Sequence, residues 1–286
     1  MSNFPIQYNE PLFRPPSEWK SLIIQITIGC SWNQCAFCEM YSSKQFRARR
    51  EEAVFADINA FIPYADQVRK VFLADGDPLV LSTGRLLRIL QHLRKVFPRL
   101  QRVSAYASPN NLIRKSIGEL VELKDAGLGL IYVGLESGDN NVLKMINKGE
   151  TYASMIEGLN KSKQAKINSS VMIINGVGGK RLSQEHAINS AKLLNEIQPK
   201  YLSTLVLTAY KGLEHLKSRL KMDFIALSQI ELIDELKQFI EHLDLQETIF
   251  RSDHASNHLV LKGVLGCDKE KFIYQINQVV NSINNF

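Results

Sequence analysis

The stretch "SLIIQITIGCSWNQCAFCEMY", residues 21–41, joins an apolar run to a loop that holds three of the four cysteines of this chain. The run at 21–28 is rich in isoleucine and predicts a buried strand. Cys30, Cys35 and Cys38 follow it closely, whereas Cys267 stands far along the sequence. Three thiolates are one ligand short of a closed zinc site and of a fully ligated iron–sulfur cluster. The loop therefore predicts a metal centre with one position open.

Further apolar runs recur along the chain, each separated from the next by a helical pattern. They lie at 70–74, 102–106, 130–135, 169–174 and 201–207. These runs are continuous rather than alternating, which is typical of parallel strands buried on both faces. Among the helix signals, Ser116 and Glu119 form a capping box, Gly127 marks a helix end, and Ser183 is a candidate N-cap. Six such units predict an α/β fold, a partial (β/α)6 TIM-type barrel, with an open doubly wound sheet as the alternative.

The chain is expected to have three parts. Residues 1–19, with four prolines, predict an extended N-terminal arm, and residues 20–210 predict the barrel. Residues 211–286 predict a mainly helical C-terminal extension that packs on the barrel, with amphipathic helices at 227–243 and 268–283.

Bulk properties narrow the class of protein. The net charge of +6 permits an acidic partner such as RNA but does not require one. The proline-broken N-terminus does not fit a signal peptide, and no apolar stretch is long enough to predict a membrane span. Four cysteines, three of them clustered, do not suit a disulfide framework, so we expect a cytoplasmic protein whose thiols stay reduced.

The cysteine loop resembles the signature of radical S-adenosylmethionine (SAM) enzymes. Their usual spacing is C-x3-C-x2-C with an aromatic residue before the third cysteine. Phe37 holds that aromatic place, while four residues separate Cys30 from Cys35, so the motif is the variant C-x4-C-x2-C. The resemblance implies that Cys30, Cys35 and Cys38 bind a [4Fe–4S] cluster whose fourth iron takes SAM. Cys267 is expected to be a small buried or incidental residue rather than a fourth ligand, and the alternative is a zinc knuckle completed by Cys267 or a histidine.

Three later segments extend the resemblance to successive strand ends. "FLADGDPLVL" (72–81) is similar to the family's Gly-Gly-Glu-type motif. "IYVGLESGDNNVLKMINKG" (131–149) is similar to a segment of the elongator, methylthiotransferase and oxygen-independent coproporphyrinogen oxidase branches. "IINGVGG" (173–179) looks like the fifth-strand end near adenine. Besides Phe37, the SAM-contacting positions implied by this resemblance are Asp75, Gly76, Asp77, Ser108, Glu136, Lys148 and Gly176.

The resemblance implies reductive cleavage of SAM to a 5′-deoxyadenosyl radical that abstracts hydrogen from an unidentified substrate, with flavodoxin or ferredoxin as a typical electron donor. The N-terminal arm and the segment 250–259 are candidate covers for the barrel mouth. In the latter, Arg251, His254 and Asn257 are candidates for orienting a polar substrate, although a solvated turn explains them equally well. The alternative function is a zinc- or iron–sulfur-bearing RNA-binding module without SAM turnover, suggested by the charge and by "RARR" (47–50).

Overall fold

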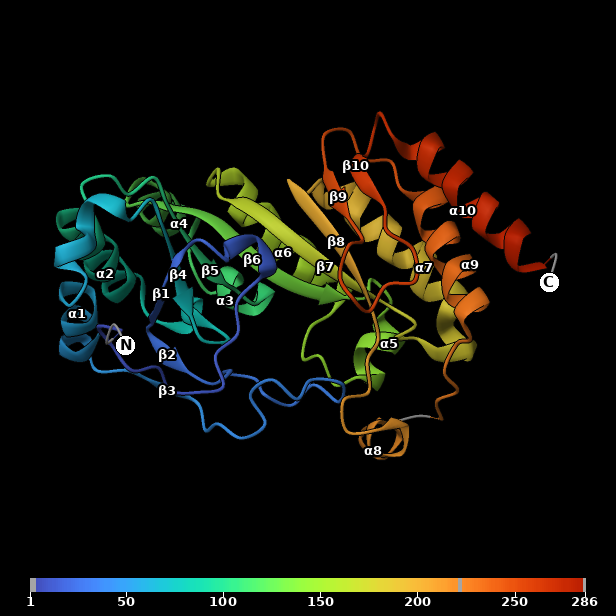
Figure 1. The fold of residues 1–286 in the computed structure, drawn as a ribbon, viewed down its shortest axis with the longest axis horizontal. Helices are drawn as coiled ribbons and strands as arrows, with labels where there is room; N and C mark the ends of the chain where they lie inside the picture. Colours follow the sequence, from blue (N-terminus) through green and yellow to red (C-terminus); the bar gives the residue numbers. More distant parts are fainter. Residues whose placement is uncertain (1–3, 221–222, 285–286) are drawn as a thin grey trace. The chain divides into compact units, whose positions relative to one another are not determined.

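The computed structural model describes residues 4–220 and 223–284 (Figure 1). The chain divides into two compact units. The first takes its described residues from Met1–Asn33, Cys38–Val133 and Glu157–Ser169, and the second from Gln34–Phe37, Gly134–Ile156 and Ser170–Phe286. Three elements run across these boundaries, namely β6 (Leu128–Glu136), α6 (Tyr152–Gln164) and β7 (Asn168–Asn175).

The first unit is a parallel βα array. Its other elements are β1 (Leu22–Gln25), β2 (Thr27–Ile28), β3 (Arg47–Ala48), α1 (Glu51–Asn59), β4 (Lys70–Ala74), α2 (Thr83–Val96), β5 (Arg102–Tyr106), α3 (Pro109–Ile113) and α4 (Ile117–Asp125). β1 pairs with β4, β4 with β5, and β5 with β6, all in parallel. Residues 71–74 of β4 are all buried, as expected for a strand covered on both faces.

The predicted strand at 21–28 is interrupted at Ile26. The Ile26 amide donates to the Ala74 carbonyl, and the Ile26 carbonyl accepts from the Arg49 amide. Beyond this point β2 leaves the main sheet and pairs antiparallel with β3. The cysteine loop therefore begins and ends on a short two-stranded ladder, a feature that the apolar run at 21–28 did not indicate.

The second unit carries the strand order β7-β8-β9-β10. Its further elements are α5 (Asn140–Met145), α7 (Gly179–Ile197), β8 (Tyr201–Val206), α8 (Leu213–Arg219), α9 (Gln229–His242), β9 (Ile249–Arg251), β10 (Lys262–Val264) and α10 (Lys269–Asn284). β7, β8 and β9 run parallel and β10 turns back antiparallel. The helices α9 and α10 lie side by side (Figure 1). The prediction of an α/β fold with parallel strands and a mainly helical C-terminal region is confirmed. Within the described residues no helix is both long and apolar enough to span a membrane.

The helix signals in the sequence gave mixed results. Ser116 and Glu119 form the predicted capping box of α4, and Gly127 follows the helix with φ +116°. Ser183 is not an N-cap, because α7 begins four residues earlier, at Gly179. The backbone is non-helical at Leu182, and the Ser183 hydroxyl donates to Glu235 Oε2. The signal at Ser183 thus marks a kink and a tertiary contact.

The N-terminus of α9 supports a first prediction. The Ser228 amide donates to Glu231 Oε2, and Lys180 lies 2.6 Å from Glu231 Oε1. The bond from Lys180 and those from Ser228 lower the pKa of Glu231 from 4.5 to about 2. A carboxyl group whose pKa is lower in the folded state stabilises the fold above its unfolded pKa, and this contribution is lost as the pH falls through the folded pKa. Glu231→Gln should therefore lower the melting temperature at neutral pH, and the deficit should disappear between pH 4.5 and pH 2.

Thermal melts across this pH range test the prediction. Because Glu231 is partly exposed to solvent, added salt should also shrink the deficit. Glu241→Gln serves as the control. Glu241 lies at the carboxyl end of the same helix, where a negative charge opposes the helix dipole, so its removal should not produce the same loss of melting temperature. An equal deficit at pH 2 and at neutral pH would contradict the electrostatic explanation.

Candidate active site

The predicted site residues lie where parallel strands end. In the first unit, Asp75, Gly76 and Asp77 follow β4, and Ser108 follows β5. In the second unit, Glu136 is the last residue of β6 and Gly176 directly follows β7. Because the carboxyl ends of parallel strands carry the chemistry in barrels of this kind, this placement suits a catalytic role.

The first stem of the cysteine loop is fixed against the end of β4. The Gly29 amide donates to Asp75 Oδ2 at 3.1 Å, and the Gly76 amide donates to the Gly29 carbonyl at 3.1 Å. Gly76 is required by crowding, since a Cβ there would stand 2.9 Å from Cys30 Cβ and 2.7 Å from the Tyr41 ring. The motif after β4 thus sets the position of Cys30.

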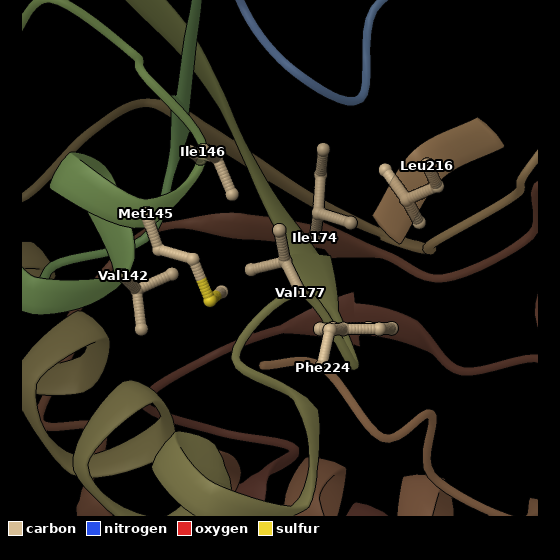
Figure 2. Close-up of a cluster of buried hydrophobic side chains, with 7 residues drawn as sticks. All are labelled: Val142, Met145, Ile146, Ile174, Val177, Leu216 and Phe224. Atoms are coloured by element: carbon tan, nitrogen blue, oxygen red, sulfur yellow. The ribbon is translucent and has the colours of Figure 1, made fainter. Parts of the chain in front are cut away.

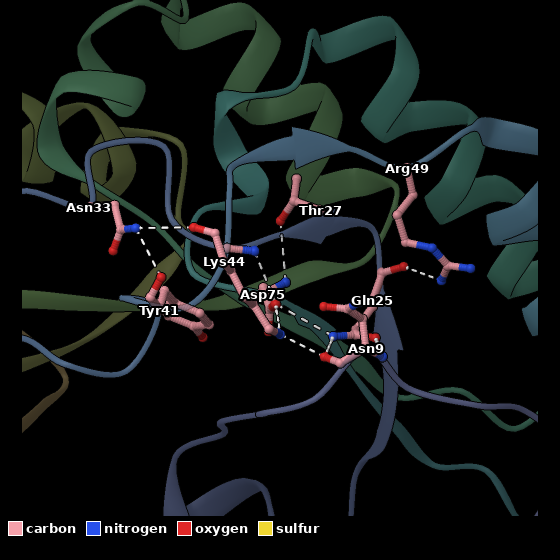
Figure 3. Close-up of polar contacts among 9 residues, drawn as sticks. Asn9, Gln25, Thr27, Asn33, Tyr41, Lys44, Arg49 and Asp75 are labelled. Carbon is pink, nitrogen blue, oxygen red and sulfur yellow. Dashed lines mark hydrogen bonds and ion pairs between the residues drawn. The ribbon is translucent and has the colours of Figure 1, made fainter.

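The second stem of the loop is fixed by Lys44, which the sequence did not single out. Lys44 Nζ lies 2.7 Å from Asp75 Oδ2, and both side chains are buried (Figure 3). Lys44 also donates to the Asn9 carbonyl of the N-terminal arm. The same Asp75 oxygen accepts from Gln25 Nε2 at 3.4 Å. One carboxylate oxygen therefore joins the end of β4 to β1 and to both stems of the loop, and Lys44 and Gln25 link this cluster to the arm.

Tyr41 lies on the same loop, with its ring close to Gly76. Its side chain is buried, and its hydroxyl has no hydrogen-bond partner among the described residues. Burial is the main cause that raises the pKa of this phenol. The nearby groups of Tyr106, Asp75, Cys30 and Cys38 raise it further. Tyr41 is therefore a neutral hydroxyl donor near Cys30 and Cys38, and it is a residue that the sequence motifs did not reveal.

Asp77 lies buried beside the loop. Its Oδ2 accepts from Ser31, the residue after Cys30, and from Asn111 Nδ2. Its Oδ1 is buried and has no partner among the described residues. Burial raises the pKa of Asp77, against the opposing effect of those hydrogen bonds. Ser108 is the N-cap of α3, where it accepts from the Asn111 amide, so it helps to place the partner of Asp77.

In the second unit Glu136 and Lys148 form a pair. Lys148 Nζ lies 2.9 Å from Glu136 Oε1, and the Glu136 side chain is 5% exposed. The other oxygen, Oε2, is buried and has no partner among the described residues. The two predicted SAM-contacting residues thus form an ion pair, and Glu136 Oε2 lacks a hydrogen-bond partner among the described residues.

The end of β7 is held by α9. The Gly176 amide donates to Glu235 Oε1 at 2.6 Å, with Gly176 at φ +80°. Glu235 is buried, and its Oε1 lies 3.8 Å from His186 Nε2. Burial lowers the pKa of His186, so its ring is neutral near pH 7. No local motif indicated Glu235, because its partners lie far away along the chain.

The remaining candidates lie in the second unit. Phe37 packs against a cluster of buried apolar side chains that includes Ile146 and Ile174. Arg251 ends β9. Asn257 Nδ2 donates to the Thr204 carbonyl of β8, and His254 Nδ1 is 2.8 Å from the Ser256 hydroxyl, which accepts from the Val206 amide. His254 and Asn257 thus belong to a segment that is hydrogen-bonded to the carboxyl-terminal half of β8.

The loop carries the donor chemistry of an iron–sulfur centre. None of the four cysteines forms a disulfide; Cys30, Cys35 and Cys38 are partly buried, and Cys267 is exposed. Thiolates are the usual ligands of such clusters. Within residues 4–220 and 223–284, no three His, Cys, Asp or Glu side chains form a ready-made metal site. The residue types on the loop fit the cluster, and Cys30 and Cys38 belong to the first unit while Cys35 belongs to the second.

Comparison with known proteins decides the family. Residues 24–194, more than half of the chain, match the family model described as the radical SAM superfamily. The chain belongs to the radical SAM superfamily. It is an enzyme of the radical SAM type, as the cysteine loop and the strand-end motifs predicted.

Sequence relatives of this radical SAM chain are named for methylthio chemistry. It is 25% identical over 189 residues to a tRNA-2-methylthio-N(6)-dimethylallyladenosine synthase from Ehrlichia canis, covering 62% of this chain and 41% of that protein. It is 25% identical over 158 residues to a protein named as a methylthiotransferase from Methanocaldococcus jannaschii, covering 51% of this chain and 33% of that protein. The chain therefore spans less than half the length of these curated relatives.

Solved structures agree on the fold. Coproporphyrinogen III oxidase from Escherichia coli matches with a TM-score of 0.61 at 18% identity, over 77% of this chain and 51% of that one. Methylornithine synthase matches with a TM-score of 0.54 at 16% identity, over 91% of this chain and 81% of that one. These likenesses support the partial barrel that the six strand-and-helix units predicted.

The ion pair at the loop stems supports a second prediction. Lys44→Met leaves the Asp75 carboxylate buried without its cation, and removing one partner of a buried pair typically costs about 3–5 kcal/mol. The midpoint of urea unfolding should fall accordingly. The double variant Lys44→Met/Asp75→Asn should lose less than the sum of the two single variants, because it leaves no unpaired charge.

Lys95→Met is the matched control, because Lys95 is an exposed lysine on α2 of the same unit. Its effect should stay within about 0.5 kcal/mol. If Lys44→Met were no more harmful than Lys95→Met, the ion pair would not be what fixes the two stems.

Proposed function

We propose that Cys30, Cys35 and Cys38 bind a [4Fe–4S] cluster and that this chain cleaves SAM reductively to act on a substrate by hydrogen abstraction. The observation that carries the proposal is the set of three cysteines, none of them in a disulfide, on the loop between β2 and β3 in a chain of the radical SAM superfamily. When bound, the cluster supplies the electron that splits SAM into methionine and a 5′-deoxyadenosyl radical.

The residues of the chain would bind and orient SAM. Asp77 Oδ1 and Glu136 Oε2, each buried without a partner among the described residues, are acceptors suited to ammonium or ribose hydroxyl groups. Lys148, which pairs with Glu136, carries a positive charge that would also suit the carboxylate of SAM. The Tyr41 hydroxyl is a further donor beside Cys30 and Cys38.

The N-terminal arm is the proposed cover of the first unit. The Tyr8 hydroxyl donates to the Ile23 carbonyl at 2.9 Å, and Asn9 exchanges two hydrogen bonds with the Gln25 side chain. Tyr8 and Leu12 also pack against Ile23, Phe72 and Ala74, beside Tyr106 and Tyr132. These contacts hold the arm against the strands and would help to keep water from the reacting groups.

An electron donor is required, because reductive cleavage of SAM consumes one electron. We propose a small redox protein of the flavodoxin or ferredoxin type, as is usual for enzymes of this superfamily, in the reducing cytoplasm that free thiols suit. The charge of the chain, +6, would suit an acidic protein of this type.

A second candidate function is RNA binding through the metal loop without SAM turnover. It is favoured by the net charge and by the tRNA-related name of one relative. Within "RARR", Arg49 is engaged by Asp57 and by the Gln25 carbonyl, whereas Arg47 and Arg50 are exposed. This function would give RNA affinity that falls steeply with salt, and it would give no 5′-deoxyadenosine.

The four cysteines provide the direct test of the cluster. After anaerobic reconstitution, Cys30→Ala, Cys35→Ala and Cys38→Ala should each lose the cluster absorbance and all 5′-deoxyadenosine formation with dithionite and SAM. Cys267→Ala should keep both, because Cys267 is exposed on the second unit. A wild-type protein that binds zinc stoichiometrically and never cleaves SAM would overturn the proposal in favour of the second candidate.

Asp77→Asn and Glu136→Gln test the proposed SAM contacts. Both changes keep the side-chain shape and remove a charge, so the cluster absorbance should stay while SAM binding weakens by about five- to a hundredfold. Binding of SAM to the reconstituted proteins and 5′-deoxyadenosine formation measure the effect. Glu122→Ala, at an exposed position of α4, is the control. Unchanged SAM binding in both variants would show that SAM is held by other residues.

A further inference from the structure

Cys35 lies on a short segment, Gln34–Phe37, that belongs to the second unit. Three hydrogen bonds fix the backbone of this segment. The Ala36 amide donates to the Ile146 carbonyl at 2.8 Å, Asn147 Nδ2 donates to the Gln34 carbonyl at 3.0 Å, and Arg219 Nη2 donates to the Cys35 carbonyl at 2.8 Å. The peptide groups on both sides of Cys35 are therefore held by the end of α5 and by α8.

Phe37 adds an apolar anchor to the same segment. Its ring packs against a cluster of buried side chains (Figure 2) that consists of Val142, Met145, Ile146, Ile174, Val177, Leu216 and Phe224. Leu216 and Arg219 are three residues apart on α8, a spacing that brings two side chains to neighbouring positions on one helix face. The helix α8 thus supplies both an apolar contact and a guanidinium group to the turn that carries Cys35.

We propose that Arg219 is a positioning residue that holds Cys35 ready to bind the cluster and places a positive charge beside it; this inference rests on the proposed function. A guanidinium bond to a carbonyl is charge-assisted and stronger than a neutral one. It fixes the Cys35 peptide, and therefore the direction of the thiol, before any cluster is bound. The positive charge would also favour the reduced, more negative cluster, since nearby charge and hydrogen bonds set the reduction potential of such centres.

The first measurement uses the apo protein, so that it does not depend on cluster chemistry. Iodoacetamide alkylation of Cys35 is followed by mass spectrometry, with the exposed Cys267 of the same molecule as the internal reference. Arg219→Met and Arg219→Gln should raise the alkylation rate of Cys35 about tenfold relative to Cys267, since one charge-assisted hydrogen bond then no longer holds the turn. Arg219→Lys, which can still donate to the carbonyl, should lie between these variants and wild type.

Lys217→Gln is the matched control for charge and for helix. It removes one positive charge from α8, at a lysine that lies 2.9 Å from Glu214 on the same helix. Its Cys35 alkylation rate should equal that of wild type. Equal rates in Arg219→Met and wild type would overturn the positioning role, and a rise in Lys217→Gln as large as in Arg219→Gln would overturn it in favour of a general loosening of α8.

The second measurement is the reduction potential of the reconstituted cluster, followed by electron paramagnetic resonance. Arg219→Gln should shift the potential to more negative values, and Arg219→Lys and Lys217→Gln should leave it close to wild type. If the reduction potential did not change in Arg219→Gln, the proposal that the positive charge of Arg219 favours the reduced cluster would be overturned. If wild type takes up no cluster at all, the proposed function fails, while the alkylation rates still decide whether Arg219 holds Cys35.

Discussion

The buried ion pair between Asp75 and Lys44 is the constraint on which the first unit of the site depends. Between β2 and β3 the chain forms neither helix nor strand, and ordering such a loop costs about 1–2 kcal/mol of conformational entropy per residue. Asp75 Oδ2 offsets part of this entropy loss, because it accepts hydrogen bonds from both stems of the loop, from Gly29 and from Lys44. The cation is needed because a lone carboxylate would be strongly disfavoured at a fully buried position.

The second unit solves the same problem by different means. The turn around Cys35 is held by the carbonyl of Ile146, the residue after α5, by the side-chain amide of Asn147 and by the guanidinium of Arg219, while Phe37 packs against an apolar cluster. The hydrogen bonds orient the peptide groups around Cys35, and the packing of the Phe37 ring anchors the same segment to the apolar cluster. The loop therefore owes its conformation to contacts with residues far from it in sequence, in each unit separately.

The strands could be predicted from the sequence because their burial on both faces leaves a continuous apolar run, and the residues at their ends could be found from family motifs. The partners of those residues could not. Lys44 is separated from Asp75 by 31 positions, Glu235 from Gly176 by 59 and Arg219 from Cys35 by 184. No local pattern of propensity or capping contains such contacts. The break at Ile26 escaped prediction for the same reason, because it is set by hydrogen bonds to Ala74 and Arg49.

Four of the buried acids differ in how they use their carboxylate oxygens. Glu18 and Glu235 use both carboxylate oxygens: Glu18 accepts from Arg102, Ser104, Tyr132 and Ser21, and Glu235 accepts from Gly176 and Ser183. Asp77 and Glu136, at strand ends, each use one oxygen and keep the other buried without a partner among the described residues.

A buried acceptor without a donor costs about 1–3 kcal/mol, and folded proteins contain few of them. A fold that needed these acids only for stability would gain by completing their hydrogen bonds, as it does at Glu18 and Glu235. A ligand that brings its own donors to Asp77 and Glu136 would recover this cost on binding. The unpaired oxygens therefore support the proposal that these two acids bind a ligand. Asp75 is the intermediate case, since one of its oxygens organises the cysteine loop and the other is unpaired among the described residues.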